Sequence, residues 1–131
     1  MHLVIDASVA TRVLLSTDDV DAELWQRLHE GTCHAPHLVD AEAGSVFRRL
    51  TKQGAIEPET AESALRAIGS LIDNRYPHGN LAHTAWRLRH DLSYYDALYV
   101  ALAARLGYPL LTADARLANA PGLPCAVELV D

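Results

Sequence analysis

The sequence predicts an α/β fold in which helices cover both faces of a parallel sheet. Two patterns predict it: short apolar runs of strand length recur along the chain, and stretches with helical spacing separate them. Strands joined through helices pair in parallel. The chain has 131 residues, enough for one domain that hides roughly two-thirds of its unfolded surface. We therefore expect a single domain over residues 1–131.

The N-terminal segment begins with an expected strand over residues 2–5, which runs into an expected helix over residues 7–15. This strand-then-helix step is the unit from which α/β folds are built. Asp18, Asp19 and Asp21 then favour the start of a second helix, because carboxylates stabilise the positive end of a helix dipole.

The middle of the chain repeats this alternation. TCHAP is expected to form a second strand, which Pro36 ends because proline cannot donate to a strand ladder. Apolar residues keep helical spacing from about Leu38 until Gly54, which predicts a third helix. A fourth helix is expected from Pro58, since a first helical turn tolerates proline.

The C-terminal part is predicted to hold two more helices and two strands. After a break at YPHG, apolar spacing predicts a helix over residues 81–92, and a much more apolar helix follows Ser93 as far as Gly107. PLLT and PCAVELV are the remaining expected strands, with a turn or short helix between them.

Composition excludes several classes of protein. Half of the residues are hydrophobic and 21% are charged, as in compact soluble proteins and unlike disordered chains. The formal net charge of −6 does not indicate general adhesion to nucleic acid through a basic surface. No apolar run approaches the roughly 20 residues of a membrane span, and no secretion signal is visible. We expect a cytoplasmic protein without membrane contact, in which Cys33 and Cys125 are reduced thiols.

Three aspartates lie where a charge is costly. Asp96 is the only charged residue between residues 92 and 104, in a helix that is apolar nearly all round, and Asp6 and Asp114 each follow a predicted strand. Each has a structural alternative. Ser93 and Asp96 have the spacing of a capping box, and the other two aspartates could cap the helices that follow them.

The start of the third helix offers a fourth acid. Asp40 and Glu42 flank the apolar stripe at similar angles, so periodicity does not choose between them. A favourable interaction with the helix dipole is the alternative explanation for Glu42. Strand ends and helix starts of an α/β protein can converge on one edge of the sheet, where ligands bind.

Four converging acids need a cation or raised pKa values, because two carboxylates about 4 Å apart repel by about 4 kcal/mol at an effective dielectric constant of 20. Oxygen ligands without a histidine and cysteine cage favour Mg²⁺ or Mn²⁺. Such an ion polarises a phosphodiester and lowers the pKa of a bound water, which a carboxylate orients for attack. The acids therefore indicate metal-dependent phosphodiester hydrolysis.

These stretches resemble the PIN-domain nucleases and, within that family, the VapC toxins of bacterial toxin–antitoxin pairs. The resemblance covers the whole chain. It rests on IDAS after the first strand, on an acid within APHLVDAEAGSVFRRL, on YPHG leading to AWRLRHDLSYYDALYVALAARLG, and on LLTADARL near the end. The stretch YDALYVALA is fairly specific, whereas DAS alone is a weak signal.

The resemblance implies a three-layer α/β/α fold with a mainly parallel sheet of about five strands, and an endoribonuclease that depends on Mg²⁺, with Mn²⁺ possible. It favours Glu42 over Asp40. The catalytic and metal-binding acids that it implies are Asp6, Glu42, Asp96 and Asp114. Ser8 and Thr112 are expected to orient ligands. Arg89 resembles an arginine often found near the site, with simple surface exposure as its alternative.

The resemblance also implies partners: an RNA substrate, a VapB-like antitoxin with a basic C-terminal tail, and a second copy of the chain in a homodimer. Recognition of single-stranded RNA depends on groove shape and on a few basic residues. Arg48, Arg49 and Lys52 in the third helix are candidates for those contacts.

Other interpretations compete with the nuclease. A catalytically inactive PIN-like module that binds protein or RNA is the main alternative, and a DNA-directed nuclease is another. A zinc site in CHAPH is disfavoured, because the spacing is not that of a zinc finger and a second pair of ligands is missing. The sequence has no P-loop and no G-x-G-x-x-G motif.

Overall fold

The predicted α/β class is confirmed by a computed structural model, which describes residues 1–17 and 19–131. Asp18, expected at the start of the second helix, lies outside the described residues. One sheet forms the centre, with parallel pairing throughout and the order β3-β2-β1-β4-β5. The strands are β1 (His2–Ile5), β2 (Thr32–Pro36), β3 (Asn74–Tyr76), β4 (Leu110–Thr112) and β5 (Val127–Leu129).

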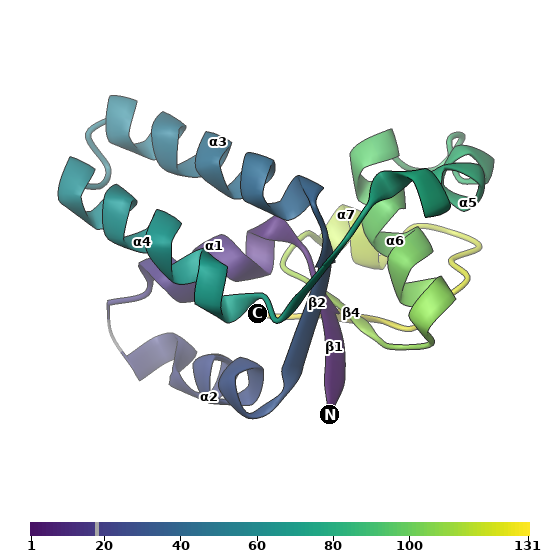
Figure 1. Cartoon of the computed structure of the whole chain (residues 1–131), viewed down its shortest axis with the longest axis horizontal. Helices are drawn as coiled ribbons and strands as arrows, with labels where there is room; N and C mark the ends of the chain where they lie inside the picture. Colours follow the sequence, from purple (N-terminus) through teal and green to yellow (C-terminus); the bar gives the residue numbers. More distant parts are fainter. Residues whose placement is uncertain (18) are drawn as a thin grey trace.

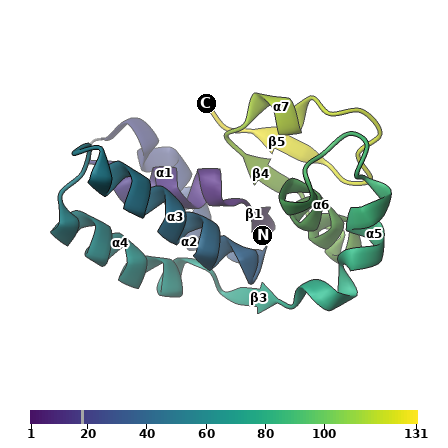
Figure 2. The same ribbon diagram turned by 90° about the horizontal axis from the view of Figure 1, so that it is seen from above.

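Helices cover both faces of this sheet, as a parallel sheet requires. They are α1 (Ala7–Leu15), α2 (Ala22–Glu30), α3 (Leu38–Lys52), α4 (Pro58–Leu71), α5 (Ala82–Arg87), α6 (Tyr94–Leu106) and α7 (Ala115–Ala118). Short 3-10 helices cover Asp19–Asp21 and His78–Asn80. In Figure 1, α1 to α4 lie on one side of the sheet and α5 and α6 on the other. Figure 2 shows α7 beside β5, which it contacts.

Strand β1 and helix α6 each contain a continuous run of buried residues, and the two elements contact one another. Leu3, Val4 and Ile5 have no exposed surface, and every residue of α6 from Ala97 to Ala103 is buried. This explains why both elements are nearly continuous apolar runs in the sequence, since a strand or helix buried on all sides has no polar face.

Two elements differ from the sequence prediction. Strand β3 was not expected, because it is a three-residue edge strand with the polar sequence NRY and no apolar run. The helix predicted over residues 81–92 ends at Arg87. Beyond it the chain continues in turns, in which the amides of Asp91 and Leu92 both donate to the Leu88 carbonyl at 3.1 Å. Leu88 and Leu92 still pack on the core, so turns place these two apolar side chains where the predicted helix would have placed them.

The strand order creates a place for a site at one edge of the sheet. From β1 the chain adds β2 and then β3 on one side, and it returns to add β4 and β5 on the other side. The connection after β1 therefore leads toward β2, and the connection after the neighbouring strand β4 leads the opposite way, toward β5. Ligands of open α/β sheets bind in the crevice at such a switch point.

Two further expectations can be compared with the structure. Cys33 is buried and Cys125 is half-buried, and both are free thiols. Within the described part of the chain, the helices are too short or too polar to cross a membrane.

Candidate active site

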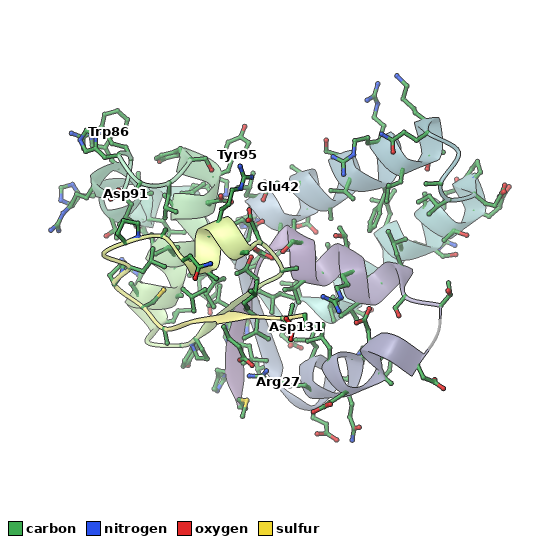
Figure 3. All side chains as sticks on the ribbon, turned by 180° about the vertical axis from the view of Figure 1, so that it is seen from behind. Arg27, Glu42, Trp86, Asp91, Tyr95 and Asp131 are labelled. Carbon is green, nitrogen blue, oxygen red and sulfur yellow. The ribbon has the colours of Figure 1, made fainter. Side chains whose placement is uncertain are left out.

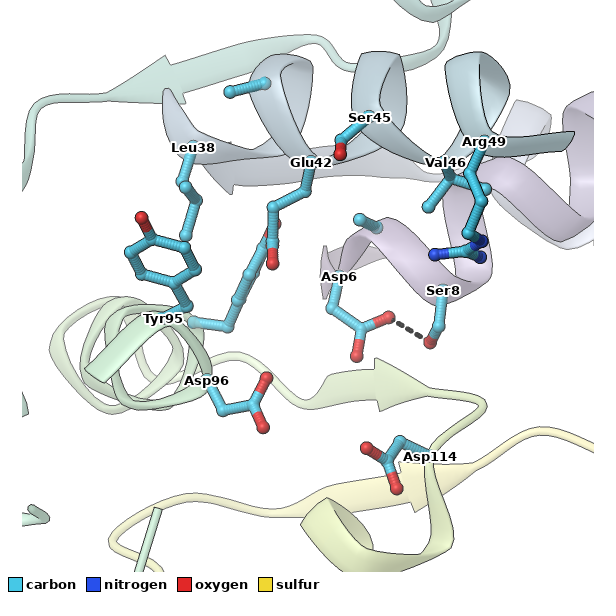
Figure 4. Close-up of a pocket in the computed structure, with 13 residues that line it drawn as sticks. Asp6, Ser8, Leu38, Glu42, Ser45, Val46, Arg49, Tyr95, Asp96 and Asp114 are labelled. Atoms are coloured by element: carbon cyan, nitrogen blue, oxygen red, sulfur yellow. Dashed lines mark hydrogen bonds between the residues drawn. The ribbon is translucent and has the colours of Figure 1, made fainter. Parts of the chain in front are cut away.

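Four carboxylates from four separate segments line one open cavity at the carboxyl edge of the sheet (Figure 4). Its volume is about 510 Å³. The acids in its wall are Asp6, Glu42, Asp96 and Asp114. One cavity is thus lined by the three aspartates that stood out in the sequence and by Glu42, which the family resemblance favoured.

Asp6 follows β1 directly and is only 5% exposed. Its Oδ1 atom accepts a hydrogen bond from the Val9 amide at 3.1 Å and so caps α1. The Ser8 hydroxyl donates to the same oxygen at 2.5 Å, and the Thr112 hydroxyl donates to Oδ2 at 2.5 Å. Capping and cavity lining are therefore not alternatives here, because one carboxylate does both.

Ser8 and Thr112 connect the end of β1 to the segment after β4. The Ser8 hydroxyl accepts from the Ala113 amide at 2.9 Å, and the Thr112 hydroxyl accepts from the Asp114 amide at 3.0 Å. A hydroxyl can donate and accept at the same time, so both side chains are held at both ends. They fix the direction of the Asp6 carboxylate and the path of the backbone that carries Asp114.

The two candidate acids of α3 point to different partners. Arg75 of β3 forms a bidentate ion pair with Asp40, with distances of 2.6 Å from Nε to Oδ2 and 2.9 Å from Nη2 to Oδ1. The same guanidinium also donates to the carbonyls of Ile68 and Ile72 at the end of α4. Asp40 is therefore part of a link between α3, α4 and β3, and only Glu42 faces the cavity.

Glu42 receives a hydrogen bond from a buried tyrosine hydroxyl. The Tyr99 hydroxyl donates to its Oε1 atom at 2.6 Å, and the Tyr99 side chain is 1% exposed. Tyr99 lies three residues after Asp96, so both project from the same face of α6. Burial raises the pKa of the Tyr99 hydroxyl, and the nearby Glu42 raises it further, so Tyr99 remains a donor at neutral pH.

Asp96 and Asp114 also take part in helix ends. The Ser93 hydroxyl caps α6 by accepting from the Asp96 amide at 3.1 Å, and the Asp114 carboxylate caps α7 by accepting from the Arg116 amide at 2.9 Å. Arg116 is almost fully exposed and lies 3.7 Å from Asp114, a contact of little energetic weight at such exposure. Both acids nevertheless line the cavity.

The environment of the cavity disfavours the ionised form of its acids. Burial raises the pKa of Asp6, Glu42 and Asp96 above their ordinary values. Neighbouring carboxylates add to the effect, since Asp96 and Asp6 raise the pKa of Glu42, and Asp114 and Asp6 raise that of Asp96. Among the described residues that line the cavity, Arg49 is the only cation.

The donor set suits a hard divalent cation, because such ions prefer carboxylate oxygens and would neutralise the shared charge. Within residues 1–17 and 19–131, no group of three or more His, Cys, Asp and Glu side chains is already arranged to hold an ion. Binding one requires the carboxylates to turn toward one another. Their mutual repulsion opposes that approach unless a cation is present.

Arg89 is not among the residues that line the cavity. Its guanidinium carbon lies 4.8 Å from the ring centre of exposed Trp86, and its Nη1 atom donates to the Trp86 carbonyl at 3.0 Å. Figure 3 shows Trp86 well away from Glu42. The structure thus places Arg89 on the exposed surface, which was the alternative to a role at the site.

Among the lining residues, Tyr95 and Tyr99 were not singled out from the sequence, and Arg49 was named only as one of three candidate RNA contacts in the third helix. Tyr99 and Tyr95 flank Asp96 in the helix, and Arg49 lies seven residues after Glu42, on the same face of α3. A signal was present for Tyr99, which is three residues from an acid in an apolar helix. Nothing local marks Arg49, because Arg48 has the same chemistry and the neighbouring position.

The histidines near CHAPH have other partners. His34 is buried and lies 2.9 Å from a ring nitrogen of His2 and 2.7 Å from the Tyr76 hydroxyl. The amide of Leu38 donates to His78. His2, His34 and Tyr76 thus form a polar cluster on the sheet.

Comparison with known proteins places these features in a family. The family model described as PIN domain matches residues 3–123. The protein named Ribonuclease VapC1 from Mycobacterium tuberculosis (strain CDC 1551 / Oshkosh) is 48% identical over 128 residues, which cover 97% of this chain and 96% of the relative.

Solved structures share the fold at low sequence identity. VapBC2 from Rickettsia felis, solved bound to a DNA fragment from their promoter, matches with a TM-score of 0.73 and 15% identity over 100% of both chains. Mycobacterium tuberculosis VapC20, described as a sarcin-ricin loop cleaving toxin, matches with a TM-score of 0.60 and 18% identity, covering 82% of this chain and 86% of that one. At these identities the likeness concerns the fold.

Proposed function

This chain belongs to the PIN-domain family and to its VapC group, and from that premise we propose that it is a metal-dependent endoribonuclease, the toxin of a toxin–antitoxin pair. The observation that carries the proposal is the cavity in which Asp6, Glu42, Asp96 and Asp114 meet. The 48% identity with a protein named Ribonuclease VapC1 supports the choice of RNA as substrate.

The four acids would hold Mg²⁺, or Mn²⁺ in its place. When bound, such an ion supplies Lewis-acid polarisation of the phosphodiester and lowers the pKa of a water. The protein's own part is to bring the carboxylates of four separate segments to one cavity. Ser8 and Thr112 orient the Asp6 carboxylate, which stays close to the sheet.

Proton transfer would fall to the half-buried acids. Glu42 and Asp96 line the cavity and are only half-buried, so a water that enters the cavity can reach them, whereas Asp6 is only 5% exposed. Tyr99 fixes one oxygen of Glu42 and leaves the other free to face the cavity. We therefore assign orientation of the attacking water to Glu42 or Asp96.

The proposal includes partners and location. A VapB-like antitoxin with a basic C-terminal tail would complement the acidic cavity, and the fold neighbour from Rickettsia felis is itself a VapBC complex. We propose in addition a homodimer in the cytoplasm. Size-exclusion chromatography with light scattering, on the chain alone and with the product of the adjacent upstream gene, measures both assemblies.

The test of the activity uses the pure protein and labelled structured RNA. Cleavage is expected with Mg²⁺, is lost with a chelator, and falls at least about 100-fold in Asp6→Asn and Asp96→Asn. Asp40→Asn is the matched control, because it removes a charge from the same helix as Glu42 but outside the cavity. Identical RNA profiles in every lane would instead indicate the inactive binding module, and cleavage of single-stranded DNA alone would indicate a DNA nuclease.

A further inference from the structure

The cavity has two chemically different ends with the acids between them. Tyr95 and Leu38 form an apolar end, and Arg49 with Val46 forms the other end, next to Ser8 (Figure 4). Leu38 and Arg49 both belong to α3, and their separation of 11 positions corresponds to about 16 Å along the helix axis. The carboxylates of Glu42, Asp6 and Asp96 lie between the two ends.

Arg49 is the basic residue of α3 that faces this cavity. Arg48 and Lys52 line a separate surface hollow between α3 and α4, together with Leu65. In the described part of the chain, the Arg49 guanidinium makes no ion pair or hydrogen bond, although acids line the same cavity. It is therefore available to an anion that enters from outside.

Tyr95 offers an exposed aromatic face at the other end. It is 58% exposed, and its hydroxyl has no hydrogen-bond partner among the described residues. The fully buried Tyr99 contrasts with it, since that ring packs in the core and its hydroxyl holds Glu42. An exposed ring beside a nuclease cavity is suited to stack on an unpaired base, whatever the base is.

We propose that a single strand of RNA crosses the cavity parallel to α3, with one base stacked on Tyr95 and a phosphate bound by Arg49. The phosphodiester between these two contacts then lies over the acids. The inference rests on the proposed function and adds to it the path of the strand. It also explains how a polyanion enters an acidic cavity: Arg49 attracts the phosphate that lies beyond the acids.

The experiment uses fluorescence anisotropy to measure binding of a fluorescent pool of random single-stranded RNA in the presence of Mg²⁺. Every variant is made in an Asp96→Asn background, which prevents cleavage and is called the parent. Tyr95→Ala is expected to weaken binding about 5- to 150-fold without changing its salt dependence, and Tyr95→Phe to keep it. Arg49→Ala is expected to weaken binding and to reduce the slope of log K against log salt concentration by about 0.7, the value for one phosphate contact on a single strand.

Matched controls lie next to both residues. Arg48→Ala and Tyr94→Ala change exposed neighbours that do not line the cavity, and both should bind like the parent. An abasic version of the RNA adds a second readout, because Tyr95→Ala should not weaken its binding. Circular dichroism checks that each variant is folded.

The outcomes separate this inference from the proposed function. If the parent binds RNA but Arg49→Ala and Tyr95→Ala behave like their controls, the strand path is wrong while the nuclease proposal stands. A parent that binds no RNA also overturns the path, and cleavage by the unmodified chain then decides whether the nuclease survives.

Discussion

The hydroxyl of Tyr99 donates a hydrogen bond of 2.6 Å to Oε1 of Glu42, and the two residues are 57 positions apart in the sequence. The contact joins α6 to α3 across the cavity. Tyr99 comes from the core and Glu42 faces the cavity, so a rigid helix determines where an acid of another helix points. A residue that orients a metal-binding acid affects metal affinity although it does not touch the metal.

We expect Tyr99→Phe to raise the Mg²⁺ concentration that gives half-maximal cleavage by about 10- to 100-fold, because outer partners of metal ligands have effects of this size. Titration of cleavage with Mg²⁺ measures it. Tyr94→Phe, which changes an exposed ring of the same helix, should have no effect. An unchanged Mg²⁺ requirement in Tyr99→Phe would show that Glu42 is held by other means.

Asp96→Asn should stabilise the metal-free protein at neutral pH. The folded-state pKa of Asp96 is raised above its ordinary value of 3.8, first by burial and then by Asp114 and Asp6. For a raised pKa, stability is fully present below the unfolded value and is lost as the pH rises through the folded value. A neutral asparagine avoids this loss.

Melting in a chelator tests this prediction. At pH 7 the variant should melt about 2–5 °C above the unmodified chain, and the difference should vanish below about pH 4. Mg²⁺ should raise the melting temperature of the unmodified chain more than that of the variant. Asp91→Asn, at an exposed acid (Figure 3), serves as control. A lower melting temperature for Asp96→Asn at pH 7 would mean that the favourable contact of the Asp96 carboxylate with Ser93 at the start of α6 outweighs the repulsion.

Asp40 and Glu42 should separate stability from activity. Asp40→Asn breaks the ion pair with Arg75, so it should lower the free energy of unfolding by up to about 1 kcal/mol, as expected for a pair that solvent partly reaches. Cleavage by this variant should stay within about twofold of that by the unmodified chain. Glu42→Gln should nearly abolish cleavage and leave stability equal or higher. Urea unfolding and RNA cleavage are measured on both variants. The reversed pattern would identify Asp40 as the functional acid of α3.

Thr112→Val should destabilise the protein although its shape is nearly unchanged. Thr112 is fully buried, and the substitution removes the donor to Asp6 Oδ2 and the acceptor for the Asp114 amide. We expect a loss of about 1.5–3 kcal/mol in the free energy of unfolding, typical for hydrogen bonds to a charged group, together with reduced cleavage. Thr112→Ser keeps the hydroxyl and is the control, and equal stability of the two variants would contradict the role given to Thr112.

Much of the fold could be predicted from local patterns. The helices at residues 7–15 and from Leu38, the strand TCHAP and the apolar helix after Ser93 all agree with the structure. Each of them carries its own periodicity and its own end signal, so no distant partner was needed. Strand β3 could not be found in this way, because a polar edge strand is defined by its pairing with β2.

The sequence by itself determined which acids are anomalous, since a lone charge in an apolar stretch is visible without knowing its neighbours. Asp6 and Asp96 were singled out for this reason, and the resemblance to a family favoured Glu42. Only the tertiary structure supplied the physical reason for that choice, by giving Asp40 an arginine partner 35 residues away. It also decided that Arg49 and not Arg48 faces the acids. Neighbouring residues of a helix have the same local signals but point about 100° apart, so their partners depend on how the helix is rotated against the sheet.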